Sequence, residues 1–429
     1  VFGSNTLAVK QGVIERLEIS GDAVGEVFSF GYVRGRQSIY EKIERVLPGE
    51  IIKIKLCGWT VESYFVTPEK ARAPVSDSLE LERALISSVS RHMIGDRPVG
   101  VALSGGLDSS LIASVACEFE RPRAFALGFE ESMFDESRYA QLVAQHLGIE
   151  LNLRRVSESE VLSYLPIYME AFDEPFADSS GLASLLLYET ASDQVQVVLG
   201  GDGADELFYG YDRYRLAKLI QAMAKIPPRL LEKCIDIVER KLRLSEQSAR
   251  IIKHLKSAAK YRGGDLINAI YAAGEPDIPH ISYLNYCSWE CGVITEVVRT
   301  MRDLDIKYYL PADILTKVDR ASMYFGVEAR NPFLDIELFS KLSEVAGGSL
   351  ISTVQTKIPL RKIARRRLPI KTVTRKKQGF RLPIETWFKS DLGKHLKYLI
   401  DSVQMPDNSL LVTNADVSHA LKKHQSGQI

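Results

Sequence analysis

Short apolar runs alternate with helical patterns through the middle of the chain. Four runs rich in apolar and β-branched residues predict strands, at residues 99–103, 124–129, 150–156 and 195–199. Apolar residues at helical spacing predict helices that run up to about residue 117, over 136–147 and over 182–191. Ser157 and Glu160 form a capping box that predicts the start of one more helix. Strands alternating with helices predict a parallel sheet with right-handed crossovers, and such sheets bind ligands at the carboxyl ends of their strands.

Residues 1–66 differ from this middle part. They are rich in β-branched and aromatic residues, and a Pro-Gly turn at 48–49 precedes an alternating stretch at 50–55. We therefore predict a β-rich unit that ends near residue 66. Residues 67–77 hold two prolines and mixed charge, which is typical of a linker.

A second domain is predicted at 78–429. Helical periodicity from residue 79 to residue 89 opens it. Beyond about residue 211 the apolar spacing is mostly helical, with Lys/Arg-rich polar faces, and no further strand is predicted. The expected fold class of this domain is α/β, with a parallel sheet followed by a helical carboxyl-terminal part.

Composition and charge exclude several classes of protein. The 429 residues are 45% hydrophobic and 26% charged, as in ordinary globular proteins, so a disordered or fibrous chain is excluded. The 55 Lys and Arg residues balance 55 Asp and Glu residues, so no global field attracts nucleic acid or an anionic membrane. The apolar stretches are far shorter than the roughly 20 residues that span a bilayer. Neither nucleic acid nor a membrane is an expected partner, and any polyanion site must be local.

The cysteines and the start of the chain bear on its location. Cysteines occur at 57, 117, 234, 287 and 291, too few and too irregular for a disulfide framework, which favours a reducing, cytoplasmic compartment. Cys287 and Cys291 share a helix face that could serve a metal, but no second Cys/His pair completes a ligand set, so packing is the favoured role. The chain begins at Val1 without a signal-peptide pattern, and we expect it to be a fragment.

The first motif that carries chemistry is SGGLDSS at 104–110, directly between a predicted strand and a predicted helix. Its glycines let backbone N–H groups approach a polyanion, its hydroxyls add donors, and the helix amino end adds partial positive charge. It is not a Walker loop, because no Gly-Lys-Ser/Thr string is present. Asp108 suits a phosphate site chiefly if Mg²⁺ lies between them. The alternative is a plain glycine-rich turn capped by Ser and Asp.

The second motif is GGDGADE at 200–206, again after a strand and before a helix. Its three acids repel one another unless a cation or an amine is present. Asp205 can share Mg²⁺ with Asp108, since both follow strands of one sheet, while Asp202 faces the cleft as a base or an amine ligand. The alternative is a solvated acidic loop.

A third segment, residues 361–381, holds ten Lys and Arg residues and no acid. A solvated helix face is the leading explanation for 361–367. Lys377 differs, because Gly379, Phe380 and Pro383 predict an ordered loop that can aim a lysine at a phosphate. Phe380 is the segment's only aromatic residue, so a base-stacking nucleic-acid surface is weakly supported.

Together these segments resemble the synthetase domain of the glutamine-dependent asparagine synthetase family. The family's pyrophosphate loop, SGGLDSS, is complete at 104–110, and its acidic loop is matched at 201–211. Residues 313–335 resemble the block D-x-L-x-K-x-D-R…E-x-R-x-P-F-L-D, and 377–383 resemble K-x-G-F-x-x-P. EPFADSS at 174–180 is a further match.

The resemblance implies a fold and a division into domains. The fold is an α/β, parallel-sheet pyrophosphate-loop ATPase (adenine nucleotide alpha-hydrolase-like) domain with a helical carboxyl-terminal part. The β-rich end of an N-terminal-nucleophile glutaminase (class II amidotransferase) domain precedes it. Residues 1–66 would be that glutaminase remnant, 67–77 the linker and 78–429 the synthetase domain. The glutaminase nucleophile is an amino-terminal cysteine, which this chain lacks, and Tyr209 stands where the family often has Gly.

The resemblance also implies a reaction. ATP and Mg²⁺ would activate aspartate as an acyl-adenylate with release of pyrophosphate, and ammonia, normally from glutamine, would then give asparagine. One alternative is a related amidotransferase that adenylates another carboxylate, such as a surface-glycan sugar acid or a β-lactam-type precursor. Another is a non-catalytic nucleotide-binding or nucleic-acid-binding module, which the complete loops argue against. The resemblance is compatible with a homodimer.

Site residues follow from matching positions. Lys377 would neutralise charge as a carboxylate oxygen attacks the α-phosphorus, and Asp202, often Glu in the family, would accept a proton from the attacking nitrogen. Asp108 and Asp205 would ligate Mg²⁺. The residues expected to bind ATP and pyrophosphate are Leu103, Ser104, Gly105, Gly106, Asp108, Ser109, Ser110, Leu127, Gly200 and Gly201.

Overall fold

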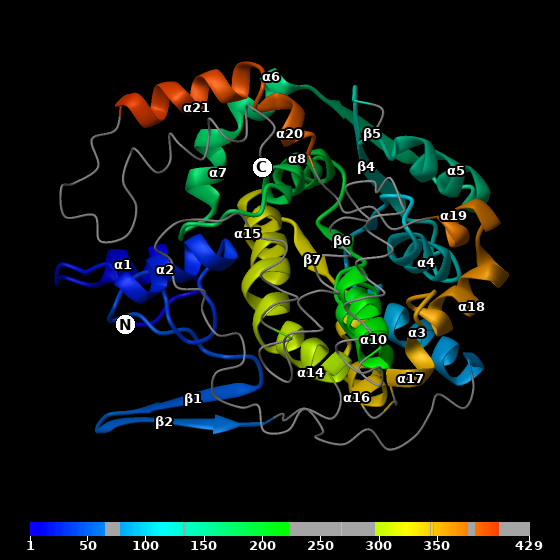
Figure 1. Cartoon of the computed structure of the whole chain (residues 1–429), viewed down its shortest axis with the longest axis horizontal. Coiled ribbons are helices and arrows are strands. Elements are labelled where there is room, and N and C mark those ends of the chain that lie inside the picture. Colours follow the sequence, from blue (N-terminus) through cyan, green and yellow to red (C-terminus); the bar gives the residue numbers. More distant parts are fainter. Residues whose placement is uncertain are drawn as a thin grey trace.

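The computed structural model of the chain describes residues 1–64, 78–131, 134–223, 267, 297–343, 345, 347–375 and 382–402 (Figure 1). Its centre is a five-stranded sheet with the strand order β5-β4-β3-β6-β7, and every neighbouring pair is parallel. The strands are β3 (Val99–Ala102), β4 (Arg123–Phe129), β5 (Leu151–Val156), β6 (Val197–Leu199) and β7 (Glu328–Arg330). The predicted α/β class with a parallel sheet is confirmed.

The edge strand β7 corrects the expectation that no strand follows residue 211. It pairs with β6 in a parallel register, Val197 with Glu328 and Leu199 with Arg330. Its three residues, Glu-Ala-Arg, have no apolar run, and the Arg330 side chain forms an ion pair with Glu328 at 2.7 Å. A strand so short and polar has no periodic signal, and only pairing with β6 defines it.

Both faces of the sheet are covered, as burial of alternate side chains requires. Along β4, Ala124 and Ala126 belong to the apolar core on one face, whereas Phe125, Leu127 and Phe129 belong to the core on the other. The helices that contribute to the first core are α3 (Ser78–His92), α4 (Leu107–Ala116), α5 (Ser137–Leu147) and α18 (Ile358–Arg367). The second core is built mainly with α8 (Ser180–Ser192) and α15 (Thr316–Tyr324), which lie across the sheet from α4 in Figure 1.

Further helical elements complete this part of the chain. They are α6 (Glu158–Ser163), α7 (Leu165–Ala171), α9 (Ala204–Leu207), α10 (Asp212–Met223), α14 (Val297–Leu304), the π-helix η1 (Asp305–Leu315), the 3₁₀ turn η2 (Pro332–Leu334), α16 (Ile336–Ser343), α17 (Gly347–Leu350), α19 (Ile370–Thr374), α20 (Ile384–Trp387) and α21 (Asp391–Ser402). The predicted cap of α6 is present, because Ser157 Oγ accepts a hydrogen bond from Glu160 N at 3.3 Å. None of the helices described is long and apolar enough to cross a membrane.

Residues 1–64 are less β-rich than predicted. They contain two helices, α1 (Thr6–Gly12) and α2 (Gly21–Phe30), before the antiparallel hairpin of β1 (Glu50–Lys55) and β2 (Gly58–Ser63). Figure 1 shows this unit in blue beside α7 and α15. Gly31 O accepts a hydrogen bond from Ala177 N at 2.8 Å, so the unit contacts the loop that precedes α8.

Candidate functional site

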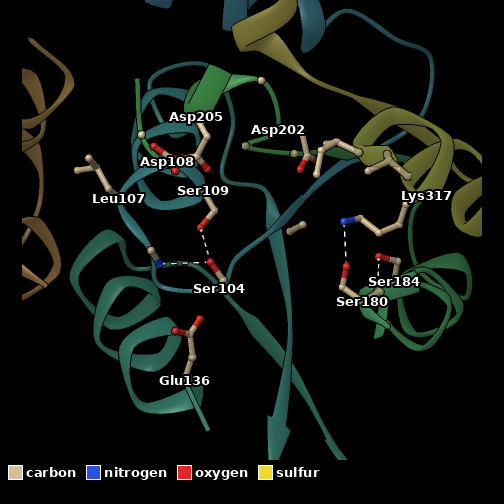
Figure 2. Close-up of a pocket in the computed structure, with 18 of the residues that line it drawn as sticks. Ser104, Leu107, Asp108, Ser109, Glu136, Ser180, Ser184, Asp202, Asp205 and Lys317 are labelled. Carbon is tan, nitrogen blue, oxygen red and sulfur yellow. Dashed lines mark hydrogen bonds between the residues drawn. The ribbon is translucent and has the colours of Figure 1, made fainter. Parts of the chain in front are cut away.

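A cavity of about 1120 Å³ lies at the carboxyl ends of β3, β4 and β6, where the fold class predicts a ligand site. Ten of the predicted site residues line it: Leu103, Ser104, Gly106, Asp108, Ser109, Leu127, Gly200, Gly201, Asp202 and Asp205. Gly105 and Ser110 are not on its wall, and Lys377 lies outside the described residues. Two loops and a strand far apart in the sequence therefore meet as predicted (Figure 2).

The first loop is shaped by Gly105 and by its own hydroxyls. Gly105 has φ +71°, and a Cβ there would collide with the backbone of Tyr139 and Ala140, so only glycine fits. Ser104 Oγ accepts a hydrogen bond from Gly106 N at 3.3 Å and lies 3.1 Å from Ser109 Oγ. No side chain caps the start of α4, whose first-turn N–H groups face the loop. The result is a cradle of donors at a helix amino end, which suits a phosphate chain.

Ser110 has a different environment from the other loop residues. It is completely buried, and its backbone N–H donates to Gly106 O at 3.1 Å. It packs beneath the loop, within α4, and supports the loop instead of facing the cavity.

Lys357 joins the two carboxylates that were predicted to share a cation. Its Nζ lies 2.6 Å from Asp108 Oδ2 and 2.6 Å from Asp205 Oδ1, and its side chain is only 4% exposed. Burial lowers the pKa of Lys357, but Asp108 and Asp205 outweigh it and the pKa is raised, so the amine is charged. The two carboxylates thus converge on one positive charge, the ammonium group of Lys357.

The residues present fit a Mg²⁺ ion that is coordinated partly by the protein and partly by the nucleotide. Two carboxylates that already converge on one cation are the usual protein contribution to such a site. No group of three or more His, Cys, Asp or Glu side chains is arranged to hold a metal in the part of the chain that the structure describes. Phosphate oxygens and water would therefore have to complete the coordination.

Sequence reasoning missed Lys357. It precedes the helix α18, which begins Ile358-Pro359, and its φ of +51° places it in the left-handed region. The available signal was a lysine just before a Pro-containing helix start, which is weak because such positions are usually solvated.

A tight turn positions Asp205. Gly210 N donates to Asp205 O at 2.7 Å, and a Cβ on Gly210 would collide with the Asp205 carboxylate and with Lys357. Tyr209, where the resembled family often has Gly, has φ +54° and is almost fully buried. Its ring packs edge-on against Tyr214 at 5.4 Å, and this burial offsets the cost of a left-handed backbone.

Asp202 lies between the phosphate loop and Lys317 in Figure 2. Burial raises the pKa of Asp202, and the nearby charges of Asp205 and Asp108 raise it further, while Lys317 opposes them. A carboxylate with a raised pKa is the stronger base, which is the property expected of a proton acceptor.

The basic segment is only partly the solvated helix face that was expected. Arg366 and Arg367 form ion pairs with Glu82 on α3, the second with its Nε at 2.7 Å from Glu82 Oε1. Arg361 lines the cavity and donates to Thr356 O at 3.1 Å. Arg375 also lines the cavity and forms an ion pair with Glu136. Two arginines therefore lie on the cavity wall, where they would stabilise anionic phosphates.

These features define a pyrophosphate-loop α/β protein, with an anion cradle and a cation site at the carboxyl edge of a parallel sheet. Residues 80–429 match the family model described as asparagine synthase. The chain belongs to the asparagine synthase family.

Individual relatives agree with this assignment. Asparagine synthetase [glutamine-hydrolyzing] 1 of Bacillus subtilis is 31% identical over 418 residues, which cover 90% of this chain and 63% of that protein. A putative asparagine synthetase [glutamine-hydrolyzing] of Mycobacterium tuberculosis is 29% identical over 432 residues, covering 96% and 65%. The chain thus spans less than two thirds of the length of these relatives. The solved NH3-dependent NAD synthetase of Campylobacter jejuni is 17% identical, with a TM-score of 0.25, over 47% of this chain and 97% of its own, a distant likeness.

Proposed function

We propose that this chain carries the ATP-dependent, amide-forming part of an asparagine synthase (glutamine-hydrolysing) type ligase, with aspartate as the acceptor. The observation that carries the proposal is the convergence of Asp108 and Asp205 on one cation beside the 104–110 loop, with Asp202 in the same cavity. Family membership supports the same reaction class. The proposed site residues have three roles: they bind the nucleotide, bind the cation or accept a proton.

The nucleotide part is the loop at 104–110 with its neighbours. Backbone N–H groups and hydroxyls of the loop would bind the phosphates, and Leu103 and Leu127 would contact the adenosine with Gly200 and Gly201. Mg²⁺, held by Asp108 and Asp205, would neutralise phosphate charge. When Mg²⁺ binds the two carboxylates, the Lys357 ammonium group would move away from them and toward the negatively charged phosphates.

The first chemical step forms an acyl-adenylate. A carboxylate oxygen of aspartate bonds to the α-phosphorus, the bond from that phosphorus to the bridging oxygen breaks, and pyrophosphate leaves. Lys377 would neutralise the charge that develops, with Lys357 and Arg361 as further cations on the described wall. Electrostatic stabilisation of this kind is usually the largest catalytic contribution.

The second step forms the amide. Ammonia attacks the activated carbonyl carbon, and Asp202 accepts a proton from the attacking nitrogen. The bond between that carbon and the oxygen bridging to phosphorus then breaks, and AMP leaves with this oxygen and the electron pair. Burial and the raised pKa of Asp202 support this role.

Residues 1–66 would be the end of a glutaminase domain that faces the synthetase cavity, with a linker at 67–77 before the synthetase domain at 78–429. Phe30, Gly31 and Tyr32 line the cavity, which supports delivery of ammonia from that side. The irregular cysteines support the expected cytoplasmic setting.

The test is pyrophosphate release from MgATP and ammonium chloride by the full chain, with and without aspartate. We expect release that depends on aspartate and that falls about 10²- to 10³-fold in Lys377→Ala. Lys376→Ala, which removes the adjacent lysine, is the matched control and should stay near wild type. Release of ADP in place of pyrophosphate would exclude adenylation.

A further inference from the structure

Glu136 faces the phosphate cradle from the side opposite to the two carboxylates of the cation site. It lines the cavity, and Figure 2 shows its carboxylate directed toward Ser104, whereas Asp108 and Asp205 lie on the other side of Ser104. The Glu136 side chain is only 14% exposed. A carboxylate on the wall of an anion site repels phosphates, so its presence there needs an explanation.

The helix α5 does not need this carboxylate. Glu136 immediately precedes α5, yet its side chain makes no capping hydrogen bond. Asp135 serves the first turn instead, because its Oδ1 accepts a hydrogen bond from Ser137 N at 3.0 Å and its Oδ2 accepts one from Ser137 Oγ at 2.9 Å. The Glu136 carboxylate is therefore not explained by the start of the helix.

The Glu136 carboxylate forms an ion pair with the guanidinium group of Arg375, the residue that follows α19. The Arg375 side chain is only 9% exposed, and its guanidinium lies over the ring of Tyr139, 4.1 Å from the ring centroid. Burial lowers the pKa of Arg375, but an arginine stays protonated in proteins, so a buried guanidinium needs an anion close by. Glu136 supplies that anion in the empty cavity.

This ion pair lies beside the phosphate loop. Gly105 packs directly on the first turn of α5, where an added Cβ would lie 2.4 Å from Ala140 N and 2.6 Å from Tyr139 Cβ. Arg375 stacks on the same Tyr139, and both members of the ion pair line the cavity. A polyphosphate at this end of the cavity would therefore meet a guanidinium that is already paired with a carboxylate.

We propose that Glu136 competes with pyrophosphate for Arg375, so that the pyrophosphate product is held weakly and leaves the site. This inference rests on the proposed function and adds a step that follows the adenylation. Arg375 contacts pyrophosphate when its guanidinium turns away from Glu136, and Glu136 takes the guanidinium back as the product leaves. The competition concerns the β- and γ-phosphates of ATP and does not extend to AMP, which lacks them.

A purely structural ion pair predicts a different result. If Glu136 and Arg375 only tied α5 to α19, removing either side chain would loosen the same wall and weaken phosphate binding. Competition requires opposite changes, because loss of the acid frees the guanidinium, whereas loss of the guanidinium removes a phosphate contact. The direction of each change therefore separates the two roles.

The first experiment is isothermal titration of the full chain with magnesium pyrophosphate and with AMP. We expect Glu136→Gln to bind pyrophosphate at least about tenfold more tightly and Arg375→Met to bind it at least about tenfold more weakly, the effect of one charge-assisted hydrogen bond. The affinity for AMP should be unchanged in both variants. Weaker pyrophosphate binding in both variants, or unchanged binding in either, would overturn the proposal.

Two exposed residues of the same region provide matched controls. Arg138 packs on the same Tyr139 ring, with its guanidinium 4.8 Å from the ring centroid, and Glu130 is an acid in the same connection between β4 and α5. Neither lines the cavity. Arg138→Met and Glu130→Gln should therefore bind pyrophosphate as wild type does, and a change as large as in the cavity variants would point to general surface charge and contradict the competition.

The double variant tests whether Glu136 acts through Arg375. Without the guanidinium the acid has no cation to occupy, so Glu136→Gln should gain much less pyrophosphate affinity in an Arg375→Met background than in wild type. A gain of full size in that background would show simple repulsion between Glu136 and the phosphates, and would contradict competition.

Metal-free pyrophosphate distinguishes a role for Glu136 as a metal ligand. Competition for Arg375 does not involve Mg²⁺, so Glu136→Gln should bind pyrophosphate more tightly with and without the metal. If Glu136 coordinated Mg²⁺, Glu136→Gln would weaken binding of magnesium pyrophosphate and leave metal-free pyrophosphate unchanged, which would also overturn the proposal.

The two proposals fail in different ways. If no acid supports pyrophosphate release, the ligase proposal falls, while titration with pyrophosphate still decides the competition. If aspartate supports release but Glu136→Gln and Arg375→Met do not change pyrophosphate affinity in opposite directions, the ligase proposal stands and the competition is overturned.

Discussion

Lys357 Nζ lies 2.6 Å from Asp108 Oδ2, across 249 positions of sequence, and the same amine is shared with Asp205. A buried lysine between two carboxylates keeps the cation site charged and ordered in the absence of nucleotide. The same amine contacts Asp108 of the 104–110 loop, so one residue can serve both states of the site.

Removing the Lys357 amine should make folding dependent on a divalent cation. Lys357→Met leaves two partly buried carboxylates facing each other, and removing one partner of a buried ion pair costs up to about 3–5 kcal/mol. We expect urea unfolding to show that loss without metal, and millimolar Mg²⁺ to restore more of it in the variant than in wild type, because no amine competes. Lys362→Met, at an exposed position on the helix α18 that follows Lys357, is the control. A variant as stable as wild type and indifferent to Mg²⁺ would contradict the shared-cation site.

The phosphate loop should tolerate an added methyl group at Gly106 but not at Gly105. Gly105→Ala forces a φ of +71° on alanine and drives its Cβ into the backbone of Ala140, so the loop must shift. Gly106→Ala meets only Ser104 Oγ, at 3.2 Å. We expect ATP affinity to fall at least about tenfold in Gly105→Ala and much less in Gly106→Ala, as measured by equilibrium dialysis. Equal losses would show that the close packing against α5 does not shape the nucleotide site.

The parts of the site that sequence predicts are those carried by local patterns. Asp108 and Asp205 were expected to share a cation because each follows a strand of one parallel sheet, and the structure brings both to one amine. Lys357 and Asp313 were not predicted, because they reach the cavity from a left-handed residue and from a π-helix. Neither conformation has a periodic signature, and only tertiary packing makes it favourable.

The elements of the fold that sequence did not predict also have no periodic pattern. Strands β3, β4 and β6 were predicted because their apolar runs are buried on both faces of the sheet. The edge strand β7 and the helices in residues 1–64 were not, since β7 is short and polar and α1 buries a single residue, Thr6. Whether 67–77 is a linker stays a prediction.

Glu174 should attach residues 1–64 to the rest of the chain. Its carboxylate accepts hydrogen bonds from Thr6 Oγ1 at 2.6 Å and Ile39 N at 2.9 Å, and it pairs with Arg45 at 2.7 Å. Glu174→Ala removes all three, each worth about 1.5–3 kcal/mol to a charged acceptor. We expect limited proteolysis to cut within residues 1–64 faster than in wild type. Glu170→Ala, at an exposed position nearby, should leave the cleavage rate unchanged; unchanged cleavage in Glu174→Ala would show that other contacts hold the unit.

Asp313 should give the chain a stability that depends on pH near neutrality. Its pKa is raised from 3.8 to about 7 by burial first and by Asp178 next, with Lys317 and a hydrogen bond from Tyr309 acting in the opposite direction. The folded state therefore keeps a proton that the unfolded state has lost, and the stability this proton provides is complete below about pH 4 and disappears as pH rises through 7.

Asp313→Asn has no such proton, so the free energy of unfolding of wild type should fall relative to the variant between pH 4 and 7. Chemical unfolding at each pH measures the difference. A wild-type minus Asp313→Asn difference that stays flat, or that rises with pH, would show that the Asp313 carboxyl group is ionised in the empty cavity and is already neutralised by its neighbours.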